Sequence, residues 1–248
     1  MSRIQILMYH RVGHFPQRMP SHRAQICHLP RFKAQMAMLR HCGYSVVSLD
    51  DAAAGLRGEK SLPPRPVVLT FDDAYVDFLE QAAPVLQAHG YPATVYAVAG
   101  LLGKTSEWVT PEGLVPAPLM SAAQLREIQA MGFTVGSHTV SHPRLAQVDT
   151  PRVIEEVTAS KRMLEDVLGV PVKHFCYPYG SHDLRAVEAA AEAGYVTGTT
   201  CQRGPATEAD DLLSLPRKAV SQGRTALGLF WMMFAKNRTR GQAIRRLV

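Results

Sequence analysis

Strand-like and helix-like segments alternate about seven times along this chain, and this order restricts its fold more than any other feature. The continuous apolar run 66–71 is of strand length and is typical of a parallel sheet that is buried on both faces. Similar runs recur at 93–99, 133–137, 174–177 and 195–199. Helical patterns accompany them at 50–56, 121–131, 150–168 and 183–193. The expected N-caps are Asp50, Ser121 and Asp183 for the first, second and fourth of these helices. This alternation predicts parallel strands with helices outside them, arranged as a barrel or a doubly wound sheet.

The chain has 248 residues, and no linker or internal repeat divides it. We therefore expect one domain, with a main body at 1–222 and a C-terminal helix at 223–248. The net charge of +6 arises in the tail, because residues 212–248 contain eight basic side chains and no acidic one. Residues 1–211 then carry 19 basic and 21 acidic side chains, which gives no indication of nucleic-acid binding.

Two interpretations of the tail remain open. Four apolar residues fall on one helical face: Leu227, Phe230, Trp231 and Phe234. With the Arg and Lys residues around and after them, they would form a basic amphipathic helix suited to peripheral contact with an anionic membrane. Alternatively, the same helix covers the bottom of a barrel.

The expected location is the cytoplasm. The apolar run 226–235 has ten residues, half of the roughly 20 that a spanning helix needs. The apolar stretch at the N-terminus is shorter than a secretory signal requires. The four cysteines show no close-pair spacing, which is consistent with reduced thiols in that compartment.

Acidic, basic and ligand-type side chains follow several predicted strands at the point where each strand ends. The first strand ends in His10, the strand 66–71 is followed by Asp72 and Asp73, and the strand 133–137 leads into His138 and His142. Carboxyl ends of parallel strands meet at one edge of a sheet or barrel, so we expect these groups to lie together.

Two histidines four residues apart and one carboxylate suit a divalent metal such as zinc. Of two adjacent aspartates, one can bind the metal while the other takes a proton from the attacking water. Each signal has an ordinary alternative when taken alone. A chain with ten histidines contains such a spacing by chance, and an Asp pair after a strand also caps a helix.

Three segments together resemble the first three motifs of the polysaccharide deacetylases (carbohydrate esterase family 4), in the family's order. They are Thr70-Phe71-Asp72-Asp73-Ala74-Tyr75, Ser137-His138-Thr139-Val140-Ser141-His142-Pro143 and Phe175-Cys176-Tyr177-Pro178-Tyr179-Gly180. The segments 7–12 and 215–220 resemble a circularly permuted branch of the family. The resemblance runs from about residue 4 to residue 220 and implies an α/β fold, a distorted (β/α)7-type barrel.

Residue by residue, the resemblance implies a metal site formed by Asp73, His138 and His142. The expected cofactor is one divalent ion, with Zn²⁺ first and Co²⁺ or Ni²⁺ as alternatives. The resemblance also implies that Asp72 is the general base. His10, on the first strand, would take the place of the general-acid histidine that the family carries near its C-terminus.

The resemblance further implies that Pro178 and Tyr179 line the substrate groove, and that Tyr179 offers its backbone N–H to the oxyanion. The sequence departs from the family pattern twice. Many members carry in the third motif an Arg that pairs with the base, whereas Cys176 precedes Tyr177 here, and we expect Arg217 to supply that charge. The tryptophan of the fourth motif has no clear match, and Trp108 in the long segment 101–119 is the candidate for the sugar groove.

The sequence thus predicts a metal-dependent hydrolase that removes an N-acetyl group from an amino sugar and releases acetate and a free amine. A cytoplasmic location favours a precursor of a surface glycan or of the cell envelope as the substrate. A deformylase or amidohydrolase acting on a small C–N substrate and a catalytically silent glycan-binding module are the alternatives. No nucleic-acid partner is expected.

Overall fold

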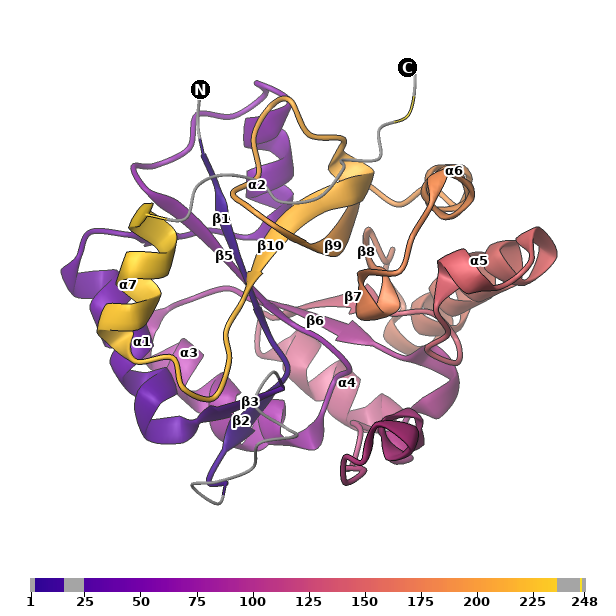
Figure 1. Ribbon diagram of the computed structural model, residues 1–248, viewed down its shortest axis with the longest axis horizontal. Coiled ribbons are helices and arrows are strands. Elements are labelled where there is room, and N and C mark those ends of the chain that lie inside the picture. Colours follow the sequence, from indigo (N-terminus) through magenta and orange to yellow (C-terminus); the bar gives the residue numbers. More distant parts are fainter. Residues whose placement is uncertain (1–2, 16–24, 236–245, 247–248) are drawn as a thin grey trace.

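The computed structural model describes residues 3–15, 25–235 and 246, and it forms a closed parallel barrel with helices outside (Figure 1). The strands of the main sheet are β1 (Gln5–Tyr9), β4 (Ser45–Val46), β5 (Pro66–Phe71), β6 (Thr94–Ala97), β7 (Thr134–Ser137), β8 (His174–Cys176), β9 (Thr197–Arg203) and β10 (Leu215–Ala219). Seven of them form a ring in the order β1-β10-β9-β8-β7-β6-β5, which the pairing of β1 with β5 closes. The expected (β/α)7-type single-domain barrel is confirmed.

β1 lies between the last strand of the chain and the strand that carries the paired aspartates. It pairs in parallel with β5, with Tyr9 opposite Phe71, and with β10, with Leu7 opposite Lys218. The backbone N–H of Asp72 donates to the carbonyl of Tyr9 at 2.9 Å. The residue after β1 and the residue after β5 therefore leave the barrel side by side.

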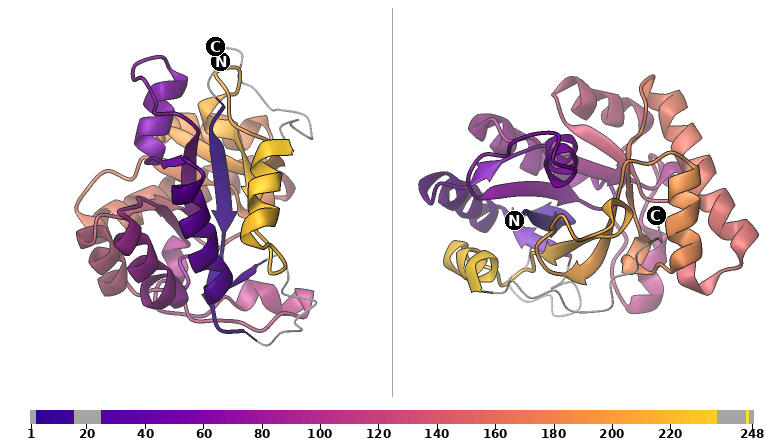
Figure 2. Two further views of the ribbon diagram at one scale, coloured as in Figure 1. Left: turned by 90° about the vertical axis from the view of Figure 1, so that its left-hand side faces the viewer. Right: turned by 90° about the horizontal axis from the view of Figure 1, so that it is seen from above.

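Helices surround the ring, as the view from above shows (Figure 2). They are α1 (Leu29–His41), α2 (Leu49–Leu56), α3 (Ala83–His89), α4 (Ala122–Ala130), α5 (Thr150–Leu168), α6 (Leu184–Glu192) and α7 (Ala226–Ala235). α4 begins with a capping box between Ser121 and Gln124, and Asp183 caps α6, both at the predicted positions. α2 is capped by Ser48 and not by the predicted Asp50, because the Ser48 side chain accepts from the N–H of Asp51.

Two regions differ from the sequence-based expectation. The polar stretch after His10 contains a small parallel pair, β2 (Arg11–Gly13) and β3 (Ile26–His28), which was not predicted. The long segment 101–119, expected to be a loop, contains a 3₁₀ turn at Glu107–Glu112. This turn carries Trp108 toward the site described below.

α7 occupies part of the predicted C-terminal segment 223–248, most of whose remaining residues lie outside the described part of the chain. Leu229, Met232 and Met233 are buried on one side of α7, and the helix packs against α1. Leu227 and Trp231 point to solvent on the other side. The buried side agrees with a helix that covers the body of the protein, and the membrane interpretation stays a prediction for the exposed side. No helix in the described residues is both long and apolar enough to span a bilayer.

Candidate metal and catalytic site

The carboxyl ends of the strands bring the predicted functional residues to one end of the barrel. His10 follows β1, Asp72 and Asp73 follow β5, and the segment with His138 and His142 follows β7. The remaining candidates reach this end from β8, from β10 and from the 3₁₀ turn: Pro178, Tyr179, Arg217 and Trp108. The structure gathers all of these side chains, with a separate environment for each of the two aspartates.

Asp73, His138 and His142 form a compact buried group. Oδ1 of Asp73 lies 3.4 Å from Nε2 of His138 and 3.3 Å from Nε2 of His142. One ligand atom from each of the three residues lies within 4.8 Å of the other two. Asp73 itself has a φ of 72°, so a local left-handed turn directs its carboxylate toward the histidines.

The donor atoms of this group fit a cation. Oδ1 of Asp73 is buried and makes no hydrogen bond within the described residues. Nδ1 of His138 lies 2.7 Å from the carbonyl oxygen of Cys176. A carbonyl only accepts, so Nδ1 carries a hydrogen and the Nε2 lone pair is left for a ligand. Two nitrogens and one carboxylate oxygen make three protein ligands, the number that a catalytic zinc site uses while it keeps a fourth position for water.

The electrostatics of the group differ between its members. Burial raises the pKa of the Asp73 carboxyl, but the adjoining imidazoles of His138 and His142 outweigh burial and hold that pKa well below its usual range. Burial lowers the pKa of His142 although the Asp73 charge opposes the change. At His138 burial lowers the pKa, but Cys176 and Asp73 outweigh burial and raise that pKa well above its usual value. A metal ion would therefore compete with a proton at His138 and meet a neutral imidazole at His142.

Glu156 holds the loop between the two histidines, and the sequence analysis did not identify it. This buried side chain on α5 accepts from the backbone N–H groups of Val140 and Ser141 at 2.7 and 2.9 Å. Arg152 neutralises it at 2.6 Å. His142 has a φ of 64°. This conformation costs free energy and persists only where the surrounding structure holds it. The available signal was an acidic residue within an otherwise mostly apolar face of a helix.

Asp72, the other aspartate of the pair, has different partners from Asp73. Nη1 and Nη2 of Arg217 donate to its two carboxylate oxygens at 2.7 and 2.8 Å. Arg217 is itself fixed by hydrogen bonds to the hydroxyl of Thr70 and the carbonyl of Thr200. Burial raises the pKa of Asp72, and the charge and hydrogen bonds of Arg217 outweigh it, so the carboxyl remains ionised.

Cys176 occupies the space beside this ion pair. Nη2 of Arg217 lies 3.0 Å from the Cys176 sulfur, and the thiol lies 3.6 Å from Oδ2 of Asp72. The structure therefore shows an arginine from β10 against the aspartate that follows β5, with a small thiol where a third-motif arginine was expected.

His10 approaches Asp72 from the strand on its other side. Its Nε2 lies 4.0 Å from Oδ2 of Asp72, and about a fifth (19%) of its side chain is exposed. The parallel pairing of β1 with β5 creates this contact. An imidazole that is partly open to solvent and next to a carboxylate can exchange protons with both a ligand and water.

Aromatic rings form one wall next to the metal-ligand group. The indole of Trp108 stacks on the His142 ring with centroids 4.4 Å apart, and the Tyr179 ring meets the same imidazole edge-on at 4.7 Å. The guanidinium of Arg144 lies 3.7 Å from the centre of the Tyr179 ring and pairs with Glu112. Tyr179 has a φ of 57°, and Pro178 before it is buried. Stacked rings beside a catalytic group are typical of a surface that binds sugar rings.

A parallel barrel with this group at the carboxyl ends of its strands has the arrangement of an active site in a β/α-barrel enzyme. The sequence profile of the polysaccharide deacetylase family matches residues 59–198, more than half of the chain. The chain belongs to this family. The matched region contains both aspartates, both histidines and the segment around Tyr179.

Known relatives agree with this assignment. YxkH of Bacillus subtilis (strain 168), a protein named for the same family, is 26% identical over 223 residues, which are 90% of this chain and 73% of YxkH. The poly-β-1,6-N-acetyl-D-glucosamine N-deacetylase of Escherichia coli (strain K12) is 46% identical over 68 residues. This match covers 27% of the present chain and 10% of the E. coli enzyme.

The fold is also shared with a solved deacetylase. PplD of Streptococcus pyogenes, determined in complex with acetate, superimposes with a TM-score of 0.79 at 28% identity. The superposition covers 94% of this chain and 98% of PplD. The two chains therefore share one barrel along almost their whole length.

Proposed function

We propose that the protein hydrolyses the N-acetyl group of an amino sugar in a metal-dependent reaction and releases acetate and a free amine. The observation that carries this proposal is that two adjacent carboxylates have different partners. Asp73 faces two imidazoles, and Asp72 faces a guanidinium and a third imidazole. One can hold a cation while the other is available for a proton.

Asp73, His138 and His142 would hold the metal ion. When bound, a divalent ion such as Zn²⁺ would act as a Lewis acid that acidifies water and polarises the amide carbonyl. Co²⁺ and Ni²⁺ suit the same nitrogen and oxygen donors.

The protein's own residues would carry the protons. Asp72, kept ionised by Arg217, takes a proton from the water whose oxygen attacks the acetyl carbon. The carbon–nitrogen bond then breaks with its electron pair on nitrogen, and protonated His10 donates a proton to that nitrogen. The water oxygen ends in acetic acid, which gives its remaining proton to solvent and leaves as acetate, and the sugar retains a free amino group. The proton on Asp72 then passes to His10 beside it, which restores both groups to their starting states.

The third-motif segment would bind the reacting group and the sugar. The backbone N–H of Tyr179 would donate to the developing oxyanion, which is worth about 10²–10³ in rate at comparable sites. Pro178, Tyr179 and Trp108 would form the wall on which the sugar lies. Acetate, named with PplD, is the product that this reaction releases.

The substrate class is an N-acetylated saccharide, and we favour a precursor of a surface glycan or of the cell envelope, met on the cytoplasmic side. The similarity to a deacetylase of poly-β-1,6-N-acetyl-D-glucosamine supports an N-acetylhexosamine unit. Free N-acetylglucosamine oligomers are thus the first substrates to test.

The test measures acetate release from N-acetylglucosamine oligomers together with metal per chain, in wild type and two variants. Asp72→Asn is expected to keep the metal and lose nearly all turnover, and His138→Ala is expected to lose the metal. Glu155→Gln, at an exposed pair on α5, is the matched control. Metal retained in folded His138→Ala would overturn the ligand assignment. Wild type that binds oligomers but releases no acetate with Zn²⁺, Co²⁺ or Ni²⁺ would point to a glycan-binding module.

A further inference from the structure

Charge is divided unevenly along the chain. All 21 acidic residues lie between positions 50 and 211, together with twelve basic ones. Residues 1–49 contain seven basic side chains and residues 212–248 contain eight, and neither segment contains an acidic residue. The described parts of these segments meet in the fold, since β1 pairs with β10 and α1 packs against α7 (Figures 1 and 2). One side of the molecule is built from acid-free sequence.

α7 on this side is apolar around its whole circumference. The helix reads ALGLFWMMFA and contains no charged residue. Such helices are normally covered on every side in a soluble protein. Here Leu227, Trp231 and Phe234 are 76%, 59% and 65% exposed. Large apolar side chains that gather in this way mark an interaction surface.

The helix is held in place with this side outward. The buried Lys218 of β10 donates to the carbonyl of Met232 at 3.0 Å, and Gln35 of α1 donates to the carbonyl of Arg224 at 2.8 Å. The exposed apolar side is thus a fixed part of the folded surface.

Two arginines border the aromatic side chains at the amino ends of the strands. A surface pocket of about 310 Å³ is lined by Arg3, Arg65, Tyr44, Phe230 and Phe234, among others. The Arg65 guanidinium lies 5.7 Å from the centre of the Tyr44 ring, which meets Phe230 at 6.5 Å. Cationic and aromatic groups therefore form one continuous surface from the start of β1 and β5 onto α7.

We propose that this surface, formed by Leu227, Trp231 and Phe234 with Arg3 and Arg65, binds an anionic lipid bilayer. Lipid phosphates would pair with the two guanidiniums, and the indole and aliphatic side chains would enter the interfacial region. A nucleic acid would satisfy the arginines but leave Leu227 and Trp231 in water. A bilayer satisfies both. Arg3 precedes β1 and the catalytic group follows it, so the substrate groove opens at the barrel end away from the lipid.

The test is sedimentation of the full chain with vesicles of phosphatidylcholine alone or mixed with phosphatidylglycerol. Binding is expected only with phosphatidylglycerol and is expected to weaken as salt rises. Leu227→Ser/Trp231→Ser should reduce binding by about tenfold or more, since burial of these two side chains is lost. Arg3→Gln/Arg65→Gln should weaken binding and flatten its salt dependence.

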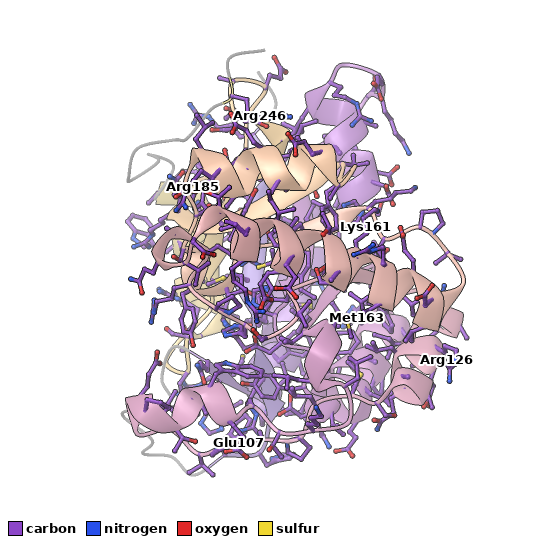
Figure 3. All side chains as sticks on the ribbon, turned by 90° about the vertical axis from the view of Figure 1, so that its right-hand side faces the viewer. Glu107, Arg126, Lys161, Met163, Arg185 and Arg246 are labelled. Atoms are coloured by element: carbon purple, nitrogen blue, oxygen red, sulfur yellow. The ribbon has the colours of Figure 1, made fainter. Side chains whose placement is uncertain are left out.

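Matched controls come from the opposite side of the molecule, where α5 faces the viewer in Figure 3. Ile154→Ser/Met163→Ser removes two exposed apolar side chains of α5, at 43% and 39% exposure. Arg126→Gln/Arg162→Gln removes two arginines, of which Arg126, like Arg65, donates to a backbone carbonyl. Both control variants should bind like wild type.

Trp231 reports its own environment once Trp108 is replaced. In a Trp108→Phe variant, phosphatidylglycerol vesicles should shift the remaining tryptophan emission to the blue, and soluble heparin should not. Binding to heparin or DNA with no blue shift on vesicles would overturn the proposal in favour of a polyanion site. Equal binding to both kinds of vesicle, or equal loss in the controls, would also overturn it. None of these readouts depends on acetate release.

Discussion

Arg217 donates hydrogen bonds to both carboxylate oxygens of Asp72, at 2.7 and 2.8 Å, although the two residues are 145 positions apart in the sequence. Both groups are buried, and the guanidinium holds the pKa of the carboxyl below its usual range against the effect of burial. The base of the proposed reaction therefore depends on β10, a strand far from it in sequence.

Arg217→Met should raise the pKa of Asp72, because burial would then act without the compensating charge. A base works only when ionised, so the acidic limb of the kcat/KM profile should move to higher pH. The profile is measured with the metal site filled. A lower rate with an unmoved acidic limb would contradict the assignment.

The same substitution leaves a buried carboxylate unpaired, which costs about 3–5 kcal/mol at comparable sites. Arg217→Met/Asp72→Asn removes both charges and should recover much of that loss in denaturant unfolding, while remaining inactive. If the double variant is no more stable than Arg217→Met, the two side chains are not coupled.

The role of His10 can be isolated through the leaving group. His10→Gln should lower turnover of an N-acetyl sugar by about 10²–10⁴, because the departing amine needs a proton. In an aryl acetate the leaving group is a stable phenolate, which needs no proton. His10→Gln should therefore hydrolyse this ester at nearly the wild-type rate. Equal losses on both substrates would indicate that His10 positions Asp72 and does not donate the proton.

Glu156→Gln tests the support beneath the two histidines. The amide still accepts a hydrogen bond but loses the charge that faces two backbone N–H groups and Arg152. Metal affinity should fall by about 10–100-fold, as for outer-shell changes elsewhere. Glu155→Gln changes its exposed neighbour and should leave the metal dissociation constant unaltered. A normal metal affinity in Glu156→Gln would show that the loop is held without this carboxylate.

Trp108 offers a direct signal from the metal group, because its indole stacks on the His142 ring at 4.4 Å. In a Trp231→Phe variant, Co²⁺ should quench the remaining emission as the site fills, whereas Zn²⁺, with its closed d shell, should not quench it. One bound Co²⁺ per chain with unchanged emission would place the ion away from His142.

Much of this arrangement follows from sequence because β/α alternation determines where strands end. The segment 66–71 has the same bounds in the prediction and in the structure, and it fixes where Asp72 and Asp73 emerge. The two histidines follow their strand for the same reason. Arg217 could be predicted because the third motif lacks the arginine that many family members carry, and because Arg217 lies in the last predicted strand.

Other features depend on tertiary contacts that a pattern does not encode. Glu156 occupies the buried face that also carries Val153, Val157 and Leu164, and only the fold shows that backbone N–H groups reach it. Ser and Asp are both favoured at an N-cap. Only the observed start of α2 at Leu49 shows that Ser48, and not Asp50, holds that position. β2 and β3 have three residues each, too few for a recognisable period.

The position of β1 has a consequence for how the chain acquires its structure. β1 is synthesised well before β10, yet one of its edges pairs with β10, more than 200 residues later. Until that strand arrives, the ring is open and two strand edges can pair with other chains. Such distant pairing slows folding. Because β1 and β10 also deliver His10 and Arg217 to Asp72, a nascent chain stopped before β10 would have an incomplete reaction centre as well as an open barrel.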